Sequence, residues 1–169
     1  KISSCNYVRV DLEGNIITNR GLNERLAIMS IMWEKHTVGK KMGFFDTVRT
    51  SADAEFYDRL TTVFTMNEFS HLDAVLIKLS HRKDSLTTND EEGVNLESVG
   101  KENSDNLDFL SPARKEYVKN YRKWHQKIRN KEVDPFITFP LLRRKFKAPK
   151  SMKIAGDTRD EYVTVSVAS

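Results

Sequence analysis

Apolar and polar positions along the first 80 residues predict several strands. Residues 4–18 alternate loosely, and Glu13-Gly14-Asn15 at their centre has the composition of a tight turn, so we expect a hairpin of two short strands. Two later apolar runs, 26–33 and 72–79, are continuous rather than alternating. Such runs are typical of buried strands, although periodicity alone does not exclude a helix at 26–33.

Three helices are also expected, and two of them show apolar residues at helical spacing. Residues 36–42 suit a short helix that stops at Gly43. A longer helix is expected after Ser51, a candidate N-cap, and a second one opens at Ser111-Pro112. The expected core face of the first is Ala52, Phe56, Leu60, Val63 and Phe64, and that of the second is Tyr117, Val118, Tyr121, Trp124 and Ile128.

Charge is distributed unevenly over the second half of the chain. Residues 84–108 hold eight acids and one lysine, and 89–106 within them have no apolar periodicity, so we expect a loop that divides the chain. Residues 111–153 hold 14 Lys/Arg and three acids. The prolines after Asp134 predict that the end of this basic stretch is an extended strap rather than a regular element.

The basic stretch is open to several interpretations. Its charges are most simply a solvated face. An anionic lipid surface or an anionic glycan acceptor ranks second. Nucleic acid ranks last, because no nucleic-acid-binding motif accompanies the charge.

The cysteine count and the two ends of the sequence predict a location for the protein and its relation to a longer chain. It has one cysteine, Cys5, which excludes an internal disulfide and favours a reducing compartment. We therefore expect the cytoplasm, or the inner face of its membrane, as the location. The chain opens on a strand-like segment without a leader, and residues 162–169 are rich in β-branched residues. Both features suggest a piece of a longer protein, with the first strand of another domain at its end.

The candidate chemistry lies in residues 43–59, GFFDTVRTSADAEFYDR. This segment combines a glycine-aromatic-aromatic-aspartate turn, an arginine and two carboxylates in the first turn of a helix. Such a cluster could bind a cation, hold a polyol or supply a general base. Composition does not choose among these.

The same residues resemble a known family. Ser30-Ile-Met-Trp-Glu-Lys, Gly43-Phe-Phe-Asp46, Ala52-Asp-Ala-Glu-Phe56 and Arg59-Leu60 are similar in order and spacing to the acceptor half of family 2 glycosyltransferases with the GT-A fold. The similarity extends to Asp84-Ser-Leu-Thr87, Ser111-Pro-Ala-Arg114 and Trp124-His125. Members of this kind build bacterial surface polysaccharides.

This resemblance implies roles for individual residues. Asp53 matches the catalytic base of inverting members, which removes a proton from the acceptor hydroxyl. The other implied roles are acceptor binding by Asp46, Arg49, Glu55 and Trp33, contact of Arg82 with the donor diphosphate, and metal binding by His81. The family's D-x-D element, which holds Mg²⁺ or Mn²⁺ and the nucleotide-sugar donor, does not occur in this chain.

The expected architecture is therefore α/β, the C-terminal half of a Rossmann-like GT-A domain with a helical and extended basic appendage. We assign 1–88 to the acceptor half, 89–110 to the acidic loop, 111–155 to the basic helix and strap, and 156–169 to a linker and following strand. The intact protein would transfer a sugar from a nucleotide-sugar to a glycan or lipid-linked acceptor. This piece alone would be inactive without its donor half, which the rest of the polypeptide or another copy would supply. The alternative is a non-enzymatic module whose basic region binds nucleic acid, a membrane surface or a protein.

Overall fold

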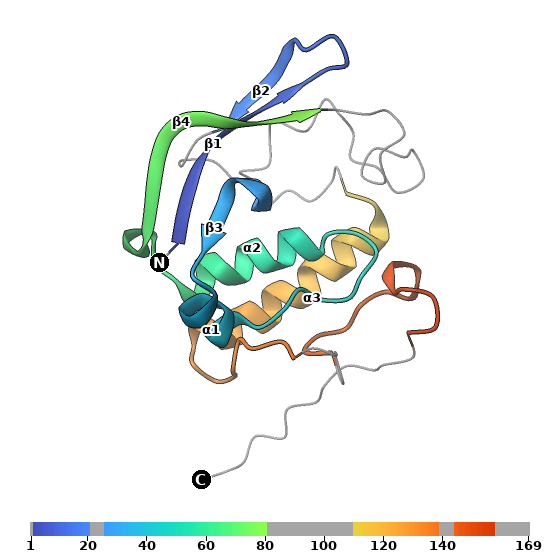
Figure 1. The fold of residues 1–169 in the computed structure, drawn as a ribbon. Coiled ribbons are helices and arrows are strands. Elements are labelled where there is room, and N and C mark those ends of the chain that lie inside the picture. Colours follow the sequence, from blue (N-terminus) through green and yellow to red (C-terminus); the bar gives the residue numbers. More distant parts are fainter. Residues whose placement is uncertain (1, 21–25, 81–109, 139–143, 158–169) are drawn as a thin grey trace.

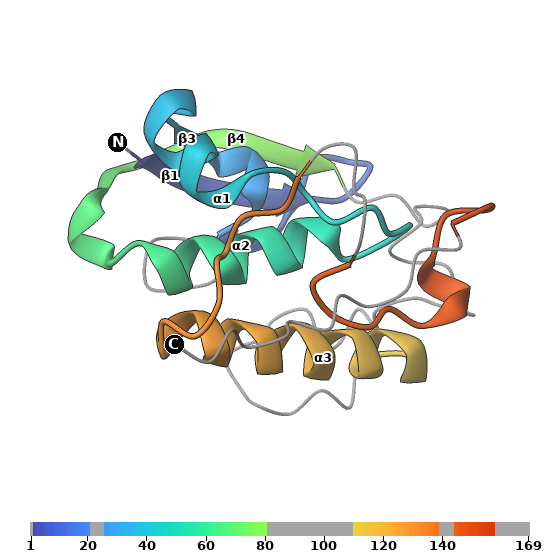
Figure 2. The same cartoon turned by 90° about the horizontal axis from the view of Figure 1, so that it is seen from below.

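The computed structural model describes residues 2–20, 26–80, 110–138 and 144–157. Within these ranges the fold is mixed α/β, as the sequence predicts. Three layers follow one another, a sheet, then helix α2 (Ala52–Val63), then helix α3 (Pro112–Arg129) (Figures 1 and 2). Residues 89–109 of the acidic loop predicted at 89–110 lie outside the described residues, as do His81, Arg82 and the strand expected at 162–169.

The sheet is built around β1 (Ile2–Val10). One edge of β1 pairs antiparallel with β3 (Ile31–Trp33) at its start and with β2 (Ile16–Arg20) at its end. The other edge pairs in parallel with β4 (Phe69–Ser80) along its whole length. The expected hairpin is thus confirmed. Its turn places Gly14 at a φ of +89°, a conformation that glycine adopts without steric cost.

The strand expected at 26–33 is only partly present. Ile28–Ser30 form a 3₁₀ turn, and only Ile31–Trp33 are extended. The Ser30 hydroxyl donates to the carbonyl of Ala27 at 2.8 Å, which closes this turn and competes with strand pairing. Met29 and Met32 are exposed, so the prediction of a buried strand over the whole of 26–33 was wrong.

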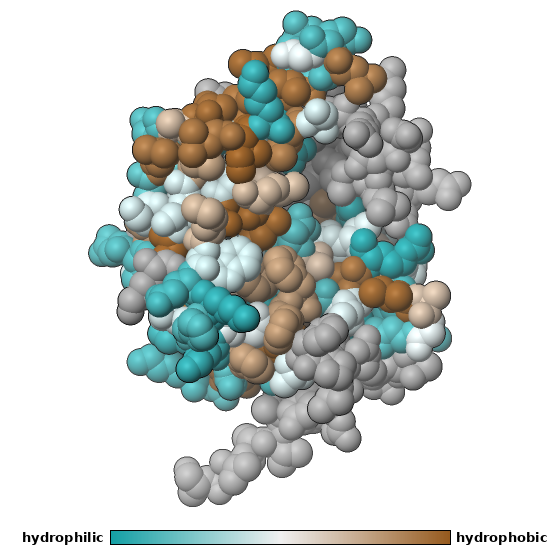
Figure 3. Space-filling view, in the orientation of Figure 1, coloured by the Kyte–Doolittle hydropathy of each residue, from teal (hydrophilic) through white to brown (hydrophobic). Residues whose placement is uncertain are grey.

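β4 is a strand as expected, but it is not buried on both faces. Phe69, Ile77 and Leu79 pack toward the core, whereas Leu72, Val75 and Leu76 are 43–64% exposed. Figure 3 shows apolar surface over the part of the molecule where Figure 1 draws β2 and β4. The continuous apolar run concealed an alternation between a core face and an exposed face.

The short helix before Gly43 is confirmed. A π-helical turn at Lys35–Gly39 leads into α1 (Lys40–Met42), and Gly43 follows with a φ of +67°. After the loop, α2 buries Phe56 and Leu60 of the expected apolar stripe in the same core as the sheet, and Phe64 follows them there. Ala52 and Val63 of that stripe are half-buried and also pack against the core that contains α3. Ser51 precedes this helix as predicted, but its backbone is left-handed and its side chain caps no amide, so its expected capping role was wrong.

α3 begins as predicted, with the Ser111 hydroxyl accepting a hydrogen bond from the Arg114 amide at 3.4 Å. A short 3₁₀ turn, Met66–Glu68, leads into β4, and another, Lys150–Met152, ends the strap. The five predicted core residues of α3 are all buried. They form a second core with the strap residues Ile137, Phe146, Ala148 and Met152. The described parts of the strap are extended and irregular, as their prolines predict.

Candidate functional site

The 43–51 loop is held between α2 and the strap. Gly43 bridges Ile137, and the Phe44 amide donates to the Ile137 carbonyl at 2.9 Å. At the other end of the loop the Arg49 amide donates to the Met152 carbonyl at 2.9 Å. Backbone pairing at both ends therefore fixes the loop that precedes the candidate base.

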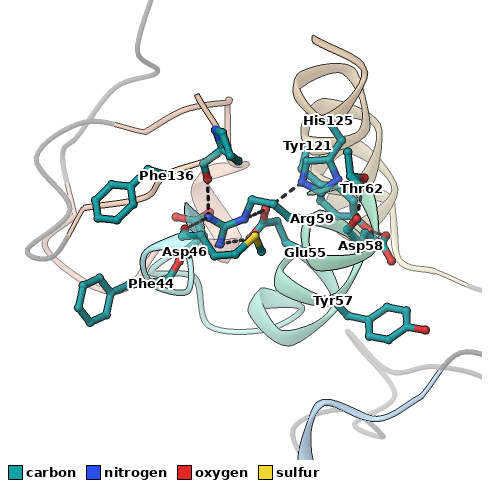
Figure 4. A network of polar contacts seen from close by, with 12 residues as sticks. Phe44, Asp46, Glu55, Tyr57, Asp58, Arg59, Thr62, Tyr121, His125 and Phe136 are labelled. Carbon is teal, nitrogen blue, oxygen red and sulfur yellow. Dashed lines mark hydrogen bonds and ion pairs between the residues drawn. The ribbon is translucent and has the colours of Figure 1, made fainter. Parts of the chain in front are cut away.

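A buried ionic cluster joins this loop to both helices (Figure 4). Glu55 on α2 lies 3.0 Å from Nε of Arg59 one turn later, and its Oε1 lies 3.0 Å from Nε2 of His125 on α3. All three side chains are at most 1% exposed. Arg59 Nη2 donates to Glu55 Oε2 at 3.2 Å, while Nε lacks hydrogen-bond geometry despite its short distance. The negative charge of the Glu55 carboxylate is therefore balanced inside the protein by the guanidinium of Arg59.

Arg59 also binds three backbone carbonyls. Its Nη1 donates to Met42 and Pro135, at 2.5 and 2.8 Å, and its Nη2 donates to Phe44 at 2.8 Å. Burial lowers the pKa of Arg59, and the Glu55 carboxylate opposes that effect. One guanidinium thus connects α1, the 43–51 loop and the start of the strap.

Asp46 forms a second buried cluster. Arg144 Nη1 donates to both its carboxylate oxygens, at 2.6 and 2.7 Å, and the Tyr117 hydroxyl donates to Oδ2 at 3.0 Å. Arg144 Nη2 reaches the Thr47 carbonyl and Asp157. Burial, reinforced by Asp46, raises the pKa of Tyr117 well above its usual value, so its hydroxyl keeps the proton that it donates.

The pKa of Asp46 is raised chiefly by burial, although Arg144 opposes the shift. A group whose pKa is higher in the folded than in the unfolded protein stabilises the fold when it is protonated. This stabilisation is complete below the pKa of an unfolded aspartate, about 3.9, and it is lost as the pH rises through the pKa of Asp46 in the folded protein. We therefore expect the free energy of unfolding of the wild type, relative to that of Asp46→Asn, to fall as the pH rises from about 3.9 through the pKa of folded Asp46. Urea unfolding of both proteins across the acid range measures it.

Asp11 provides a control of opposite sign for this titration. Its pKa is lowered mainly by the side-chain hydrogen bond from Asn15. The stability of the wild type relative to Asp11→Asn should therefore rise with pH and be lost in acid. Parallel pH profiles for the Asp46 and Asp11 variants would contradict the assignment for Asp46.

The structure separates the predicted site residues into two groups. Asp46 and Glu55 are buried and partnered, whereas Asp53 in the first turn of α2 and Arg49 in the loop are exposed. Trp33 is half-buried, with its ring centroid 5.1 Å from that of Phe56, three residues after Asp53. Arg49 and Asp53 thus flank the start of α2 in the sequence, and Trp33 contacts the same helix through Phe56.

The sequence predicts no part in the site's ionic clusters for four residues that organise this region, Arg59, His125, Tyr117 and Arg144. Arg59 could have been found, because Glu55 and Arg59 are one helical turn apart and suit an ion pair. No local pattern indicates that His125, Tyr117 or Arg144 would meet carboxylates 70 or more residues away. Among the described residues, no group of three His, Cys, Asp or Glu side chains is placed to hold a metal ion. His81, the predicted metal ligand, lies outside the described residues.

Comparison with known proteins adds no assignment. No protein-family model matches the chain, and no curated protein matches it. Within the part of the chain that the structure describes, no helix is both long and apolar enough to cross a membrane. Functional inference therefore depends on the residues and their geometry.

Proposed function

We propose that this chain contributes the acceptor side of a GT-A fold glycosyltransferase that uses a nucleotide-sugar donor, with Asp53 as the base. The observation that carries the proposal is the state of the four acids in the 43–59 segment. Asp46 and Glu55 are buried in ion pairs, and Asp58 accepts a hydrogen bond from Tyr121 at 2.7 Å. Asp53 is the exposed carboxylate of the four.

An exposed carboxylate is what this chemistry needs. A general base must come within hydrogen-bond distance of the proton that it removes, about 2.6–3.2 Å between heavy atoms. Glu55, two residues on, points to the opposite side of the helix, where Arg59 and His125 hold it. The ionic cluster therefore fixes the first turn of α2 without occupying the Asp53 carboxylate. Such fixed support is how enzymes position their reacting groups.

In the proposed reaction Asp53 takes the proton of an acceptor hydroxyl while that oxygen bonds to the anomeric carbon of the donor. The bond from that carbon to the diphosphate breaks, and the nucleoside diphosphate leaves with the electron pair. The resemblance assigns the donor site and its divalent metal to another part of the enzyme, where the metal would neutralise the leaving diphosphate. The chain's own contributions are the base and the acceptor surface near Arg49 and Trp33, and the product belongs to surface polysaccharide synthesis.

The test is sugar transfer by the polypeptide that contains this chain together with its donor half. Asp53→Asn keeps the size of the side chain and removes its basicity. We expect kcat to fall by about 100-fold or more, since general base catalysis contributes about 10² to 10⁴. Asp73→Asn makes the same chemical change at an exposed carboxylate of β4 and should leave kcat unaltered.

Two results would oppose the proposal. Transfer by Asp53→Asn within a few-fold of the wild-type rate would remove Asp53 as the base. If the wild-type protein released no nucleoside diphosphate from any common nucleotide-sugar in the presence of a glycan acceptor, its assignment as a glycosyltransferase would be excluded.

A further inference from the structure

The outer face of α3 carries a row of exposed cations. Lys119, Lys123 and Lys127 are all exposed and follow one another at intervals of four residues, about 6 Å along the axis. The helix buries its opposite face, so these side chains cannot turn inward. Glu116 is the only acid in the helix.

The strap enlarges this cationic face. The Asn120 side chain donates to the Lys147 carbonyl at 3.0 Å, which places the strap beside the helix. We use the name basic face for the exposed cations of the helix, the turn that follows it and the strap. They are Lys119, Lys123, Lys127, Arg129, Lys131, Lys147 and Lys150.

The helix alone does not explain this arrangement. Like charges four residues apart destabilise a helix by roughly 0.2–0.5 kcal/mol per pair, so the row costs stability. The helix dipole favours the cations of the last turn, Lys127 and Arg129, but it gives Lys119 and Lys123 no such advantage. Within the described ranges, none of the seven side chains forms an ion pair with an acid. Binding to an external anion would offset that cost.

The shape and composition of the basic face narrow the choice of anion. Proteins that bind single-stranded nucleic acid stack bases on exposed aromatic side chains. The aromatic residues of α3, Tyr117, Tyr121 and Trp124, are all at most 5% exposed in the core. The lysines of the face also lie on the outer side of a helix whose opposite face is buried. A broad, exposed array of lysines instead suits a flat anionic surface.

We propose that the basic face binds the headgroup surface of a bilayer that contains anionic phospholipid. No large apolar residue of α3 is exposed, so the contact is electrostatic and lies at headgroup level, without insertion into the acyl region. Figure 2 shows α3 alongside α2, and α3 packs its buried stripe on that side. The exposed lysines of α3, Lys119, Lys123 and Lys127, therefore lie on the side of the helix away from α2 and its Asp53. The two surfaces could thus work at the same time, and the inference does not depend on the proposed function.

The experiment measures partition of the full chain into phosphatidylcholine vesicles with and without phosphatidylserine. We expect binding only to the vesicles with phosphatidylserine, and loss of that binding as salt is raised. The triple variant Lys119→Gln, Lys123→Gln, Lys127→Gln should partition on the order of 100-fold more weakly, from the usual contribution of each lysine near such a surface. Far-UV circular dichroism should show that its helices are retained.

A matched control removes the same charge elsewhere, at Lys35→Gln, Lys40→Gln and Lys78→Gln, all exposed and outside α3 and the strap. This protein should bind the vesicles within a few-fold of the wild type. Equal loss in both triple variants would show that net charge alone matters and would overturn the proposal. So would equal binding to vesicles without phosphatidylserine. Tighter binding to a single-stranded RNA than to the anionic vesicles would replace the membrane with a polymeric anion.

Discussion

Replacing Arg59 with methionine is expected to lower the free energy of unfolding by about 3–5 kcal/mol, the usual cost of breaking a buried ion pair on one side. The substitution leaves the Glu55 carboxylate buried with only His125 beside it. It also removes the donor to the buried carbonyl of Met42 and to the part-buried carbonyls of Phe44 and Pro135. Methionine fills most of the volume, so the loss reports on polar contacts rather than on a cavity.

Thermal and urea unfolding measure this effect, and a shift in Tm of roughly 10 °C corresponds to it for a protein of this size. Arg49→Met is the matched control, because Arg49 is exposed in the same region, and we expect a change within about 0.5 kcal/mol. Glu55→Leu combined with Arg59→Met removes the stranded charge and should recover part of the loss. If Arg59→Met were as mild as Arg49→Met, the cluster would not hold the fold together.

Gly43→Ala is expected to destabilise the fold by about 3 kcal/mol, from a strained backbone and two lost backbone hydrogen bonds. Gly43 has a φ of +67°, which side chains disfavour, and a Cβ there would lie 2.0 Å from the Ile137 carbonyl oxygen. The strap must therefore move away, which breaks the bonds from Phe44 to Ile137 and from Ile137 to Met42.

Gly14→Ala separates the two causes. Gly14 also has a positive φ, of +89°, but a Cβ there would meet nothing within 4 Å. It should cost about 1 kcal/mol from backbone strain alone. Chemical unfolding of the two variants compares them. Equal losses would mean that the contact between Gly43 and the strap contributes little.

Local patterns were sufficient for much of this fold. The apolar stripes of α2 and α3 recur every three or four residues, so each helix could be located from its own sequence. The hairpin could be predicted for the same reason, because Glu13-Gly14-Asn15 specify its turn. The burial of β4 was predicted wrongly. It depends on which other parts of the chain cover each face of the strand, and the sequence of residues 72–79 does not contain that information.

The candidate site was harder to predict than the fold. The sequence marks residues 43–59 as the candidate functional segment, but its carboxylates have different environments that only tertiary contacts define. Asp46 and Glu55 are buried beside the basic partners Arg144 and His125, respectively. Arg144 comes from the strap and His125 from α3, both far from residues 43–59 in the sequence. Asp53 differs from Glu55 in exposure because two residues on a helix turn a side chain to another face.

The long separation between ionic partners has a consequence for how the chain folds. Asp46 and Arg144 are 98 residues apart, and Glu55 and His125 are 70 apart. Contacts between distant residues must close long loops before they add stability, which slows folding. At about 5–20 residues per second, a ribosome needs about 5–20 s to make the 98 residues that separate Asp46 from its counter-ion. During synthesis the hairpin can form early, whereas the loop that precedes Asp53 must wait for the strap.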